Sequence, residues 1–464
     1  MKKYQRLAEQ IRDQIASGVW QPGDRLPSLR EQVVSSGMSF MTVGHAYQLL
    51  ESQGRIIARP QSGYYVAARP ERELAAPQVQ VMRDEAVDIN TYIFDMLQAS
   101  RDASVMPFAS AFPDPRLFPL QQLNRSLAQV SKTATAMSVI ENLPPGNAEL
   151  RHAIARRYAQ QGMTISPDEI VITTGALEAL NLSLQAVTEP GDWVIVENPC
   201  FYGALQALER LRLKALSVAT DVKEGIDLAA LEQALQEYPV KACWLMTNSQ
   251  NPLGFTLSAE KKARLVALLE KYHVMLIEDD VYSELYFGRE KPLPAKAWDR
   301  ADSVLHCSSF SKCLVPGFRI GWVAAGKHAR RIQRLQLMST LSTSSPMQLA
   351  LVDYLSTRRY DAHRQLAERK QQAWQTLLRH LPAEVKIHHN DSGYFLWLEL
   401  PEPLDAGVLS THALAHHISI APGKMFSTSG SWTRFFRFNT AWHWGDREEQ
   451  AVKQLGKLIR EMMK

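Results

Sequence analysis

Four short apolar runs, separated from one another by helical patterns, constrain the fold of this chain more than any other feature. They cover residues 170–172, 193–196, 242–246 and 274–277. Near-continuous apolar strands are typical of a parallel sheet that is buried on both faces. Because these strands alternate with helices, the sequence predicts a large α/β domain. The chain has 464 residues, enough for two to four domains of about 100–200 residues each.

Residues 1–66 follow a different pattern and predict a separate, mainly helical unit. Leu7, Ile11 and Ile15 recur every four residues, which lays one apolar stripe along a first helix that ends at Gly18. The basic start runs into this helix without a continuous apolar stretch, so we expect no secretory signal.

Two capped helices are predicted after the first one. Ser28 and Glu31 have the spacing of a capping box, and the helix that they open ends at Gly37. Ser39 is placed to cap a third helix, which Gly54 closes. The inward face of this third helix is predicted to consist of Val43, Ala46, Tyr47 and Leu50. Two short helices joined by a tight turn predict a helix-turn-helix.

A strand at 56–59, a turn at 60–63 and a strand at 64–66 then predict a wing. Residues 1–66 hold eight Lys or Arg and five Asp or Glu, so they carry +3 of the chain's net charge of +4. With 52 basic and 48 acidic residues in all, the whole chain is too balanced to coat nucleic acid. A basic binding surface therefore has to be local. On the pattern of this unit alone, a generic packing domain is the alternative to a DNA-binding winged helix.

The segment 18–66 resembles the winged-helix head of the GntR family of bacterial transcription factors. Its Pro-Gly-Asp-Arg-Leu-Pro-Ser-Leu-Arg stretch, its Leu-Glu-Ser-Gln-Gly stretch and its Ser-Gly-Tyr-Tyr-Val stretch carry the resemblance, which implies binding to double-stranded DNA. The first side chains of a recognition helix face base edges in the major groove. The candidates for base contacts are therefore Ser39, Phe40, Met41, Thr42 and His45.

The same resemblance implies further DNA contacts. Arg30, at the end of Leu-Pro-Ser-Leu-Arg, is implied as a phosphate or groove contact. The implied minor-groove probe is the tip of the wing, which consists of Gln61, Ser62 and Gly63. Phe40 departs from the pattern, because many relatives carry an arginine there. A contact that reads guanine is therefore absent from this position.

A charged, alanine-rich segment with two prolines follows the wing and predicts a linker. The predicted boundaries are 1–68 for the head, 69–87 for the linker and 88–464 for the body. Within the linker, residues 79–81 can alternatively form a short strand.

Polar and glycine residues collect where the predicted strands end. The stretches concerned are 173–177, 197–203, 247–254, 278–282 and 307–322. Free amides at a helix start bind anions, and an aromatic pair can stack on a flat ring. A buried carboxylate requires a cation, and a lysine among apolar neighbours can have the lowered pKa that imine formation requires.

Taken in order, these stretches resemble the fold-type I pyridoxal-phosphate enzymes of the class I aminotransferase group, over roughly 100–464. The Ser-x-Ser-Lys-x-x-x-Pro-Gly-x-Arg-x-Gly and Asn-Pro-x-Gly motifs carry the resemblance. It implies pyridoxal 5'-phosphate bound as an internal aldimine on Lys312. Asp279 is implied as the partner of the pyridine nitrogen. Asn251 and Tyr282 are implied as partners of the ring's phenolate oxygen, and Phe201 as the stacking ring.

The resemblance also implies a phosphate site and an effector contact. The implied phosphate ligands are Ser309, Ser311, Arg319 and the helix start at Gly175, Ala176 and Leu177. Arg437 is implied as the arginine that forks onto a substrate carboxylate, with a surface salt bridge as the alternative. A smaller C-terminal α+β subdomain is expected.

Three departures from that group bear on activity. The Ala-Ser-Ala stretch at 109–111 lacks the glycine that relatives often have beside the substrate. Ala176 stands where relatives often carry a hydroxyl, and Glu141 stands where relatives commonly have a tyrosine that reaches the neighbouring subunit's phosphate. We expect cofactor binding to survive these changes better than efficient transamination does.

Other classes of site find no support in the sequence. The histidine pairs have neither cysteine partners nor HExxH spacing, so we expect no metal site. Four widely spaced cysteines without a CxxC pair predict a reduced, cytoplasmic chain. No stretch approaches the about 20 apolar residues of a membrane span.

A GntR-type head joined to an aminotransferase-like body is the architecture of the MocR-type subfamily, and the resemblance covers nearly the whole chain. It implies a transcriptional regulator that senses an amino acid or amine by aldimine exchange at Lys312. It also implies a homodimer, with a head-to-tail arrangement. A working aminotransferase with an accessory head is the alternative, because the same residues serve both functions.

Overall fold

The computed structural model describes most of the chain as two compact units, Met1–Ala76 and Pro77–Lys464, here called the head and the body. The described residues are 3–16, 19–21, 23–59, 62–67, 80–81, 93–94, 98, 102, 104–139, 143–287, 290–357, 363–390, 392–427 and 429–464. Gly18, Gln61 and Glu141 lie outside them. Because the predicted linker is described only at residues 80 and 81, the boundaries 1–68, 69–87 and 88–464 stay a prediction.

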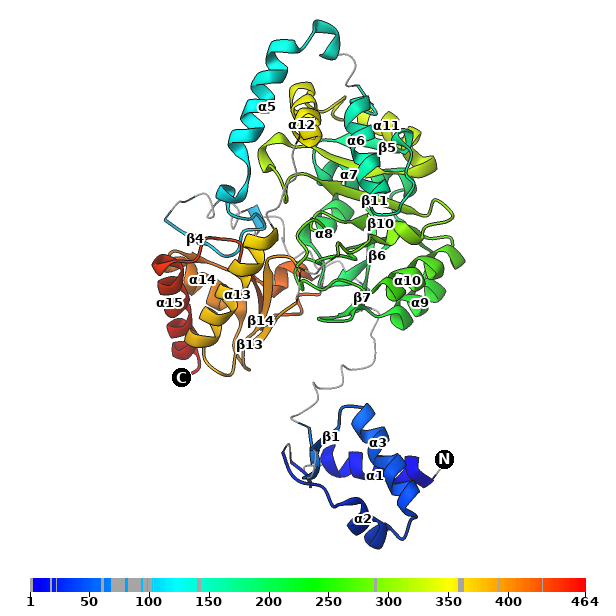
Figure 1. Ribbon diagram of the computed structural model, residues 1–464, viewed down its shortest axis with the longest axis vertical. Coiled ribbons are helices and arrows are strands. Elements are labelled where there is room, and N and C mark those ends of the chain that lie inside the picture. Colours follow the sequence, from blue (N-terminus) through cyan, green and yellow to red (C-terminus); the bar gives the residue numbers. More distant parts are fainter. Residues whose placement is uncertain are drawn as a thin grey trace. The chain divides into compact units, whose positions relative to one another are not determined.

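Three helices and a two-stranded hairpin form the head (Figure 1). They are α1 (Lys3–Ala16), α2 (Leu29–Ser36), α3 (Phe40–Ser52), β1 (Ile56–Arg59) and β2 (Gly63–Val66). The strands are antiparallel, with Ile56 opposite Val66. The predicted inward face of α3 is fully buried and packs with Leu7 and Ile11 of α1. The predicted winged helix is therefore confirmed.

The helix ends of the head follow the capping pattern predicted from the sequence. Ser28 and Glu31 form both hydrogen bonds of a capping box, and Gly37 ends α2 in the left-handed conformation, with φ +64°. Ser39 caps α3, because its side chain accepts a hydrogen bond from the Thr42 amide. These caps fix the angle between the two helices of the helix-turn-helix.

A large, mostly parallel sheet organises the body, in the order β3-β7-β6-β9-β10-β11-β12-β5, with β8 beside β7. The strands are β3 (Gln80–Val81), β5 (Ile170–Thr173), β6 (Trp193–Asn198), β7 (Lys214–Asp221), β8 (Gly225–Ile226), β9 (Val240–Leu245), β10 (Met275–Asp279), β11 (Val304–Ser309) and β12 (Gly321–Ala324). Neighbours from β7 to β11 pair in parallel, whereas β12 is antiparallel to both of its neighbours. The four predicted apolar strands are present as β5, β6, β9 and β10. The strand left open within the linker is present as β3.

Helices cover both faces of this sheet (Figure 1). They include α5 (Leu120–Thr133), α6 (Ala148–Ala159), α7 (Ala176–Val187), α8 (Tyr202–Arg210), α9 (Leu228–Glu237), α10 (Ala259–Lys271), α11 (Ala329–Leu337) and α12 (Ser345–Thr357). Val194 and Val196 of β6 pack in the cluster formed with α7, α8 and α11. Ile195, between them, packs in the cluster formed with α9 and α10. Because successive strand residues point to opposite faces, burial on both faces gives the continuous apolar runs seen in the sequence.

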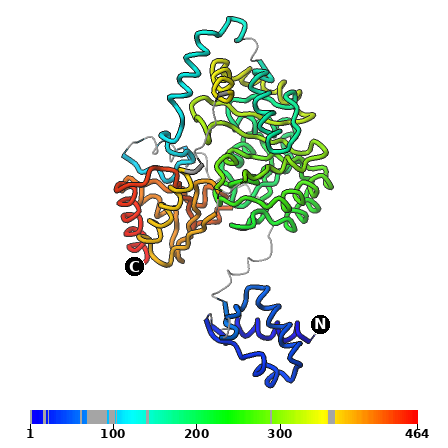
Figure 2. The backbone as a smooth tube through the Cα atoms, in the orientation of Figure 1, coloured from blue at the N-terminus to red at the C-terminus, as the bar shows by residue number. Residues whose placement is uncertain are grey.

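The C-terminal part of the body, drawn gold to red in Figure 2, is a smaller α+β subdomain. Its sheet has the order β13-β14-β17-β16 and is antiparallel. It contains α13 (His363–His380), β13 (Lys386–His388), β14 (Phe395–Glu399), α14 (Ala406–Ala415), β15 (Ile418–Ser419), β16 (Ala421–Pro422), β17 (Phe435–Asn439) and α15 (Asp446–Met462). Strand β15 pairs in parallel with β4 (Met106–Pro107), which joins an earlier segment to this subdomain. The predicted fold class is confirmed.

Candidate functional site

Lys312 follows the end of β11 and is half-buried as a residue. Its Nζ atom donates a hydrogen bond to the carbonyl oxygen of Ala111, 2.7 Å away, and lies 3.5 Å from the ring centroid of Phe112. Burial of the amine, together with the positive charges of Arg437 and Arg319, lowers the pKa of Lys312 to about 7. The amine is therefore largely neutral in mildly alkaline solution, the form that attacks carbonyl groups.

Asp279, the last residue of β10, is a buried carboxylate with unused hydrogen-bonding capacity. Its Oδ1 atom is buried without a hydrogen-bond partner. Burial, together with the negative charge of the neighbouring Asp280, raises the pKa of Asp279 to about 7. A cation placed at Oδ1 would stabilise the charged form, so this end of β10 can hold a protonated ring nitrogen.

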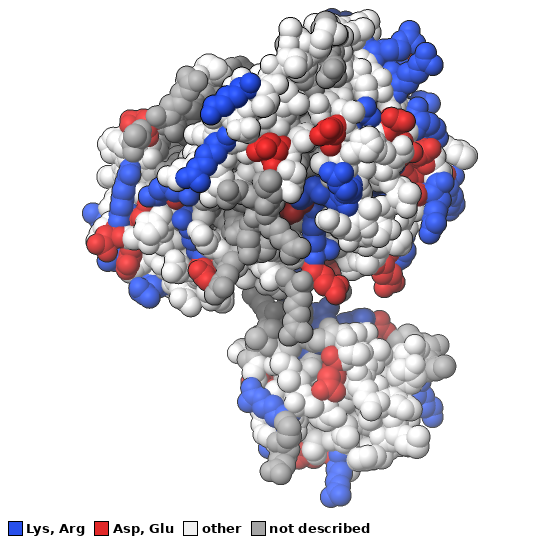
Figure 3. Space-filling view, turned by 45° about the horizontal axis from the view of Figure 1, so that its top comes forward, with Lys and Arg blue, Asp and Glu red and all other residues white. Residues whose placement is uncertain are grey.

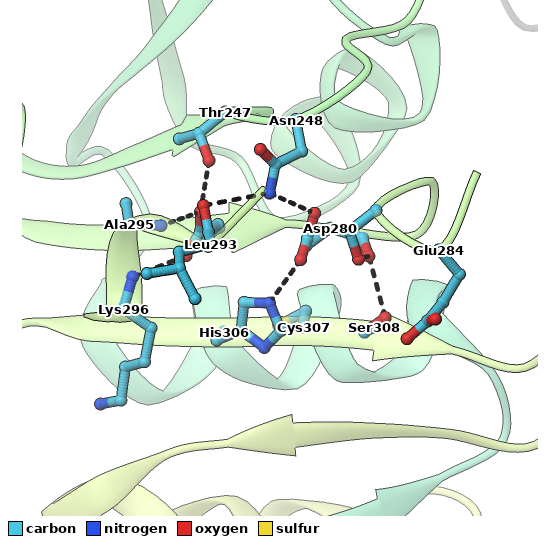
Figure 4. A network of polar contacts seen from close by, with 12 residues as sticks. Thr247, Asn248, Asp280, Glu284, Leu293, Ala295, Lys296, His306, Cys307 and Ser308 are labelled. Carbon is cyan, nitrogen blue, oxygen red and sulfur yellow. Dashed lines mark hydrogen bonds and ion pairs between the residues drawn. The ribbon is translucent and has the colours of Figure 1, made fainter. Parts of the chain in front are cut away.

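A buried polar network holds the residue next to Asp279 (Figure 4). Asp280 Oδ2 lies 2.9 Å from His306 Nε2, and Asn248 Nδ2 donates to Asp280 Oδ1 over 3.1 Å. His306 Nδ1 lies 2.6 Å from the hydroxyl of Tyr158. The network fixes the backbone that presents Asp279. Reasoning from the sequence missed it, although a histidine inside the apolar run of β11 was the available signal.

A tight cradle forms where β5 meets α7. Gly175 has φ +82°, and a Cβ atom added to it would lie 2.4 Å from Arg319 Nη2. A Cβ atom on Gly321 would lie 2.8 Å from the Ala176 amide nitrogen. Arg319 also donates to the hydroxyl of Ser311 over 3.2 Å. Helix α7 begins at Ala176 without a side-chain cap, so its first amides and Arg319 together can hold an anion.

The predicted phosphate ligands do not all lie in equivalent surroundings. Ser309 and Ser311 are buried, and the Ser311 amide donates to the Ser309 hydroxyl over 3.4 Å. Leu177 keeps 47% of its surface exposed. Its amide belongs to the start of α7, whereas its side chain faces outward.

Arg437, in β17, is fully buried rather than part of a surface salt bridge. Its Nη1 atom donates to Asn251 Oδ1 and its Nη2 atom donates to the Ala109 carbonyl oxygen, each over 2.6 Å. Its Nε atom and the Asn251 Nδ2 atom are buried without a partner. Burial lowers the pKa of Arg437. In the part of the chain that the structure describes, no carboxylate forms an ion pair with this guanidinium.

Aromatic side chains line the same region. Phe201 follows β6, and a Cβ atom on Gly203 would lie 2.4 Å from its ring, so glycine at this position leaves room for the ring. Tyr282 is buried, its ring centroid lies 5.7 Å from that of Tyr394, and burial raises its pKa. The Tyr394 hydroxyl donates to the Ala111 carbonyl, the oxygen that Lys312 also contacts. No feature of the sequence indicates this shared carbonyl.

On the head, the predicted DNA contacts are accessible where they are described. Arg30, Ser39 and His45 are exposed. Thr42 is half-buried, as are Ser62 and Gly63 at the tip of the wing. The Ser62 hydroxyl lies 2.7 Å from the Tyr65 hydroxyl, which ties the tip to β2. On the face of the body shown in Figure 3, basic and acidic side chains are interspersed.

Comparisons with known proteins match both units to families. Residues 3–66 match the bacterial regulatory proteins of the gntR family, and residues 114–455 match aminotransferase class I and II. The chain is 87% identical to the HTH-type transcriptional regulator YdcR of Escherichia coli, over 100% of both chains. It is 33% identical to the HTH-type transcriptional regulator YjiR of the same organism, again over 100% of both. The chain belongs to the MocR-type gntR regulators.

Solved structures similar to this MocR-type regulator include aminotransferases. The α-aminoadipate aminotransferase LysN of Thermus thermophilus, complexed with N-(5'-phosphopyridoxyl)-L-leucine, has a TM-score of 0.73 and 27% identity. The kynurenine aminotransferase of Pyrococcus horikoshii has a TM-score of 0.74 and 26% identity. Each match covers 80% of this chain and 95% of the other chain.

The cofactor of the MocR-type body is pyridoxal phosphate, and the donor set in the structure fits it. An amine with a pKa near neutrality, a buried carboxylate with an unpartnered oxygen and an anion cradle at a helix start meet at the same edge of the sheet.

Among the described residues, no group of three or more His, Cys, Asp or Glu side chains is arranged to hold a metal ion. No helix within the described ranges is long and apolar enough to cross a membrane.

Proposed function

We propose that this regulator binds promoter DNA through its head and senses an amino acid or amine at Lys312 in its body. The observation that carries the proposal is the pairing of a capped helix-turn-helix with a buried amine whose pKa is near 7. A ligand shifts an equilibrium between two arrangements only by its different affinity for each of them. The effector therefore has to bind one arrangement of the regulator more tightly than the other.

The following roles toward the cofactor belong to this proposal. When bound, pyridoxal phosphate supplies an aldehyde that condenses with amines and a ring that withdraws electrons. Lys312 holds it covalently, and Asp279 keeps its ring nitrogen protonated. The Asn251 side chain and the Tyr282 hydroxyl hydrogen-bond its phenolate oxygen. Phe201 stacks on the ring. The phosphate ligands are Ser309, Ser311, Arg319 and the start of α7 at Gly175, Ala176 and Leu177.

The substitution Gly175→Ala tests the cradle. We expect it to lower the free energy of unfolding by about 1–2 kcal/mol, because φ +82° is strained for alanine. We also expect affinity for pyridoxal phosphate to fall at least about tenfold, because the new Cβ atom displaces Arg319. The control is Gly191→Ala, since Gly191 has φ +95° and open space at its Cβ position. Equal cofactor affinity in the two variants would contradict the assigned role of Arg319.

The lowered pKa of Lys312 predicts how cofactor uptake depends on pH. Below about pH 7 the amine is protonated and cannot attack an aldehyde, whereas above it the neutral amine predominates. We expect the uptake rate of cofactor-free protein to rise through pH 7 and to level off near pH 8. A lysine with an ordinary pKa of about 10.4 would give a rate that still rises at pH 9. Stopped-flow absorbance distinguishes the two profiles.

Arg437 is proposed as the contact for the effector's carboxylate. A buried cation without a carboxylate partner is costly, and an amino-acid carboxylate would relieve that cost. The guanidinium fork also fits a carboxylate with two hydrogen bonds. This proposal favours an amino acid over an amine that lacks a carboxylate.

The active form is proposed to be a homodimer with a head-to-tail arrangement. Four apolar side chains are exposed in the single chain in the first turn of α7 and at or just after the end of α11, namely Leu177, Leu337, Met338 and Leu341. Thr340, beside them, donates to Glu178 of α7, which brings the two segments together. A second copy would bury these side chains.

The four cysteines are free and buried, which fits the proposed cytoplasmic location.

An absorbance screen against amino acids and amines, followed by DNA-binding assays, tests the proposal. When its effector is added, the full chain should show a lasting change in the absorbance spectrum of its cofactor. A chain lacking residues 1–76 should show the same spectral change but should no longer bind DNA. Rapid, complete conversion of the cofactor to its amine form by common amino acids would favour the alternative, a working aminotransferase. Sequence-specific DNA binding by the truncated chain would contradict the role of the head.

A further inference from the structure

The first turn of α3 presents apolar side chains at the place where a recognition helix meets base edges. Phe40 keeps 55% of its surface exposed and Met41 keeps 72%. Both precede the buried face of α3, which begins at Val43. Neither side chain belongs to the hydrophobic core cluster of the head.

The polar side chains of this turn are already engaged with one another. The hydroxyls of Ser39 and Thr42 lie 2.8 Å apart, and the Thr42 amide donates to the Ser39 hydroxyl over 3.3 Å. These bonds hold the start of the helix. His45, one turn further on, has an edge contact with the ring of Tyr4, with 5.9 Å between centroids. The groups most available at the first turn are therefore the two apolar ones.

Gly44 lies one turn after Phe40, inside α3. Nothing lies within 4 Å of the position that its Cβ atom would occupy. Glycine inside a helix destabilises it relative to alanine, so packing does not account for this residue. The missing side chain leaves room for the helix backbone to approach a partner closely.

We propose that Phe40 and Met41 read the C5-methyl groups of thymines in the major groove. The thymine methyl is the apolar group on the major-groove edges of the four standard bases, and apolar side chains contact it. Guanine and adenine are instead read by bidentate Arg, Lys, Asn or Gln side chains, and the first two positions of α3 have none. The inference rests on the proposed DNA binding and assigns it a base class: each half-site contains thymines opposite the first turn of α3.

The test uses the full chain with pyridoxal phosphate bound. A duplex site is selected from a random DNA library, and each of its thymines is then replaced in turn by deoxyuridine, which lacks only the methyl group. We expect affinity to fall about fourfold for each contacted methyl, the effect of burying one such group. Replacing a contacted T·A pair by 5-methylcytosine·G should lose less affinity than replacing it by C·G, because 5-methylcytosine keeps the C5-methyl group that cytosine lacks.

Substitutions in the head identify the residues that cause the loss of affinity when deoxyuridine replaces thymine. Met41→Ala and Phe40→Ala should bind the thymine and deoxyuridine forms with more nearly equal affinity. Val34→Ala is the matched control, because Val34 of α2 is 85% exposed and apolar, and this variant should keep the full deoxyuridine effect. Gly44→Ala should stabilise the head but weaken binding.

The outcomes separate this inference from the function on which it rests. If the library yields no preferred sequence, the proposed DNA-binding function fails and the inference fails with it. If a site is selected and every deoxyuridine form binds within twofold of the thymine form, only the inference is overturned. Equal deoxyuridine effects in Met41→Ala, Phe40→Ala and the parent chain would also overturn it.

Discussion

The Lys312→Ala variant is expected to lose completely the visible absorbance of covalently held pyridoxal phosphate. Lys312 supplies a buried amine with a pKa near 7, beside a carboxylate and an anion cradle that fit the rest of the cofactor. Without that amine, the remaining contacts can hold the cofactor only reversibly. Dialysis should therefore remove it from the variant but not from the parent chain.

The control for this experiment is Lys327→Ala. Lys327 is exposed and donates to the Ala301 carbonyl over 3.0 Å at the surface. This variant should keep both its absorbance and its bound cofactor. If Lys312→Ala also kept its absorbance after dialysis, the assignment of Lys312 would be wrong.

Arg437→Met is expected to weaken the response to an amino-acid effector by about 30-fold or more. Truncating one partner of a buried, hydrogen-bonded charge pair costs about 2–5 kcal/mol, and about 2 kcal/mol corresponds to that factor. Methionine keeps much of the side-chain volume among the rings of Phe395 and Phe426. The measurement is the effector concentration that gives half of the spectral change.

Two comparisons make this result specific. The amine formed from the same amino acid by removal of its carboxylate should respond equally in Arg437→Met and in the parent chain. Arg434→Met is the control variant, because Arg434 precedes β17 and pairs with Glu399 over 3.0 Å. An equal loss for the amino acid and its amine would show that Arg437 acts through packing and not by binding a carboxylate.

The sequence predicted those parts of the fold that depend on local patterns. Buried strands of a parallel sheet are apolar on both faces, so β5, β6, β9 and β10 were visible as continuous runs. The helix starts at Ser28 and Ser39 depend on hydrogen bonds within four residues, and both caps are present. Such features need no knowledge of distant segments.

Contacts between distant segments were less accessible to sequence reasoning. Lys312 meets the Ala111 carbonyl 201 residues away, and a carbonyl leaves no trace in the side-chain pattern. His306 and Asp280 form a pair because β10 and β11 are neighbours in the sheet, which spacing along the chain does not encode. The positions of motif residues could be predicted, whereas most of their partners could not.

The most direct test of effector sensing at Lys312 measures DNA affinity with and without the effector. The full chain, loaded with pyridoxal phosphate, is titrated onto its selected duplex at zero and saturating effector, in parallel with Lys312→Ala. We predict that the effector changes the parent chain's affinity at least about fivefold, the low end of ordinary allosteric coupling, and leaves Lys312→Ala unchanged. If the effector left the affinity of the parent chain unchanged while the amino group was steadily transferred to a keto acid, the proposed sensing role would be wrong.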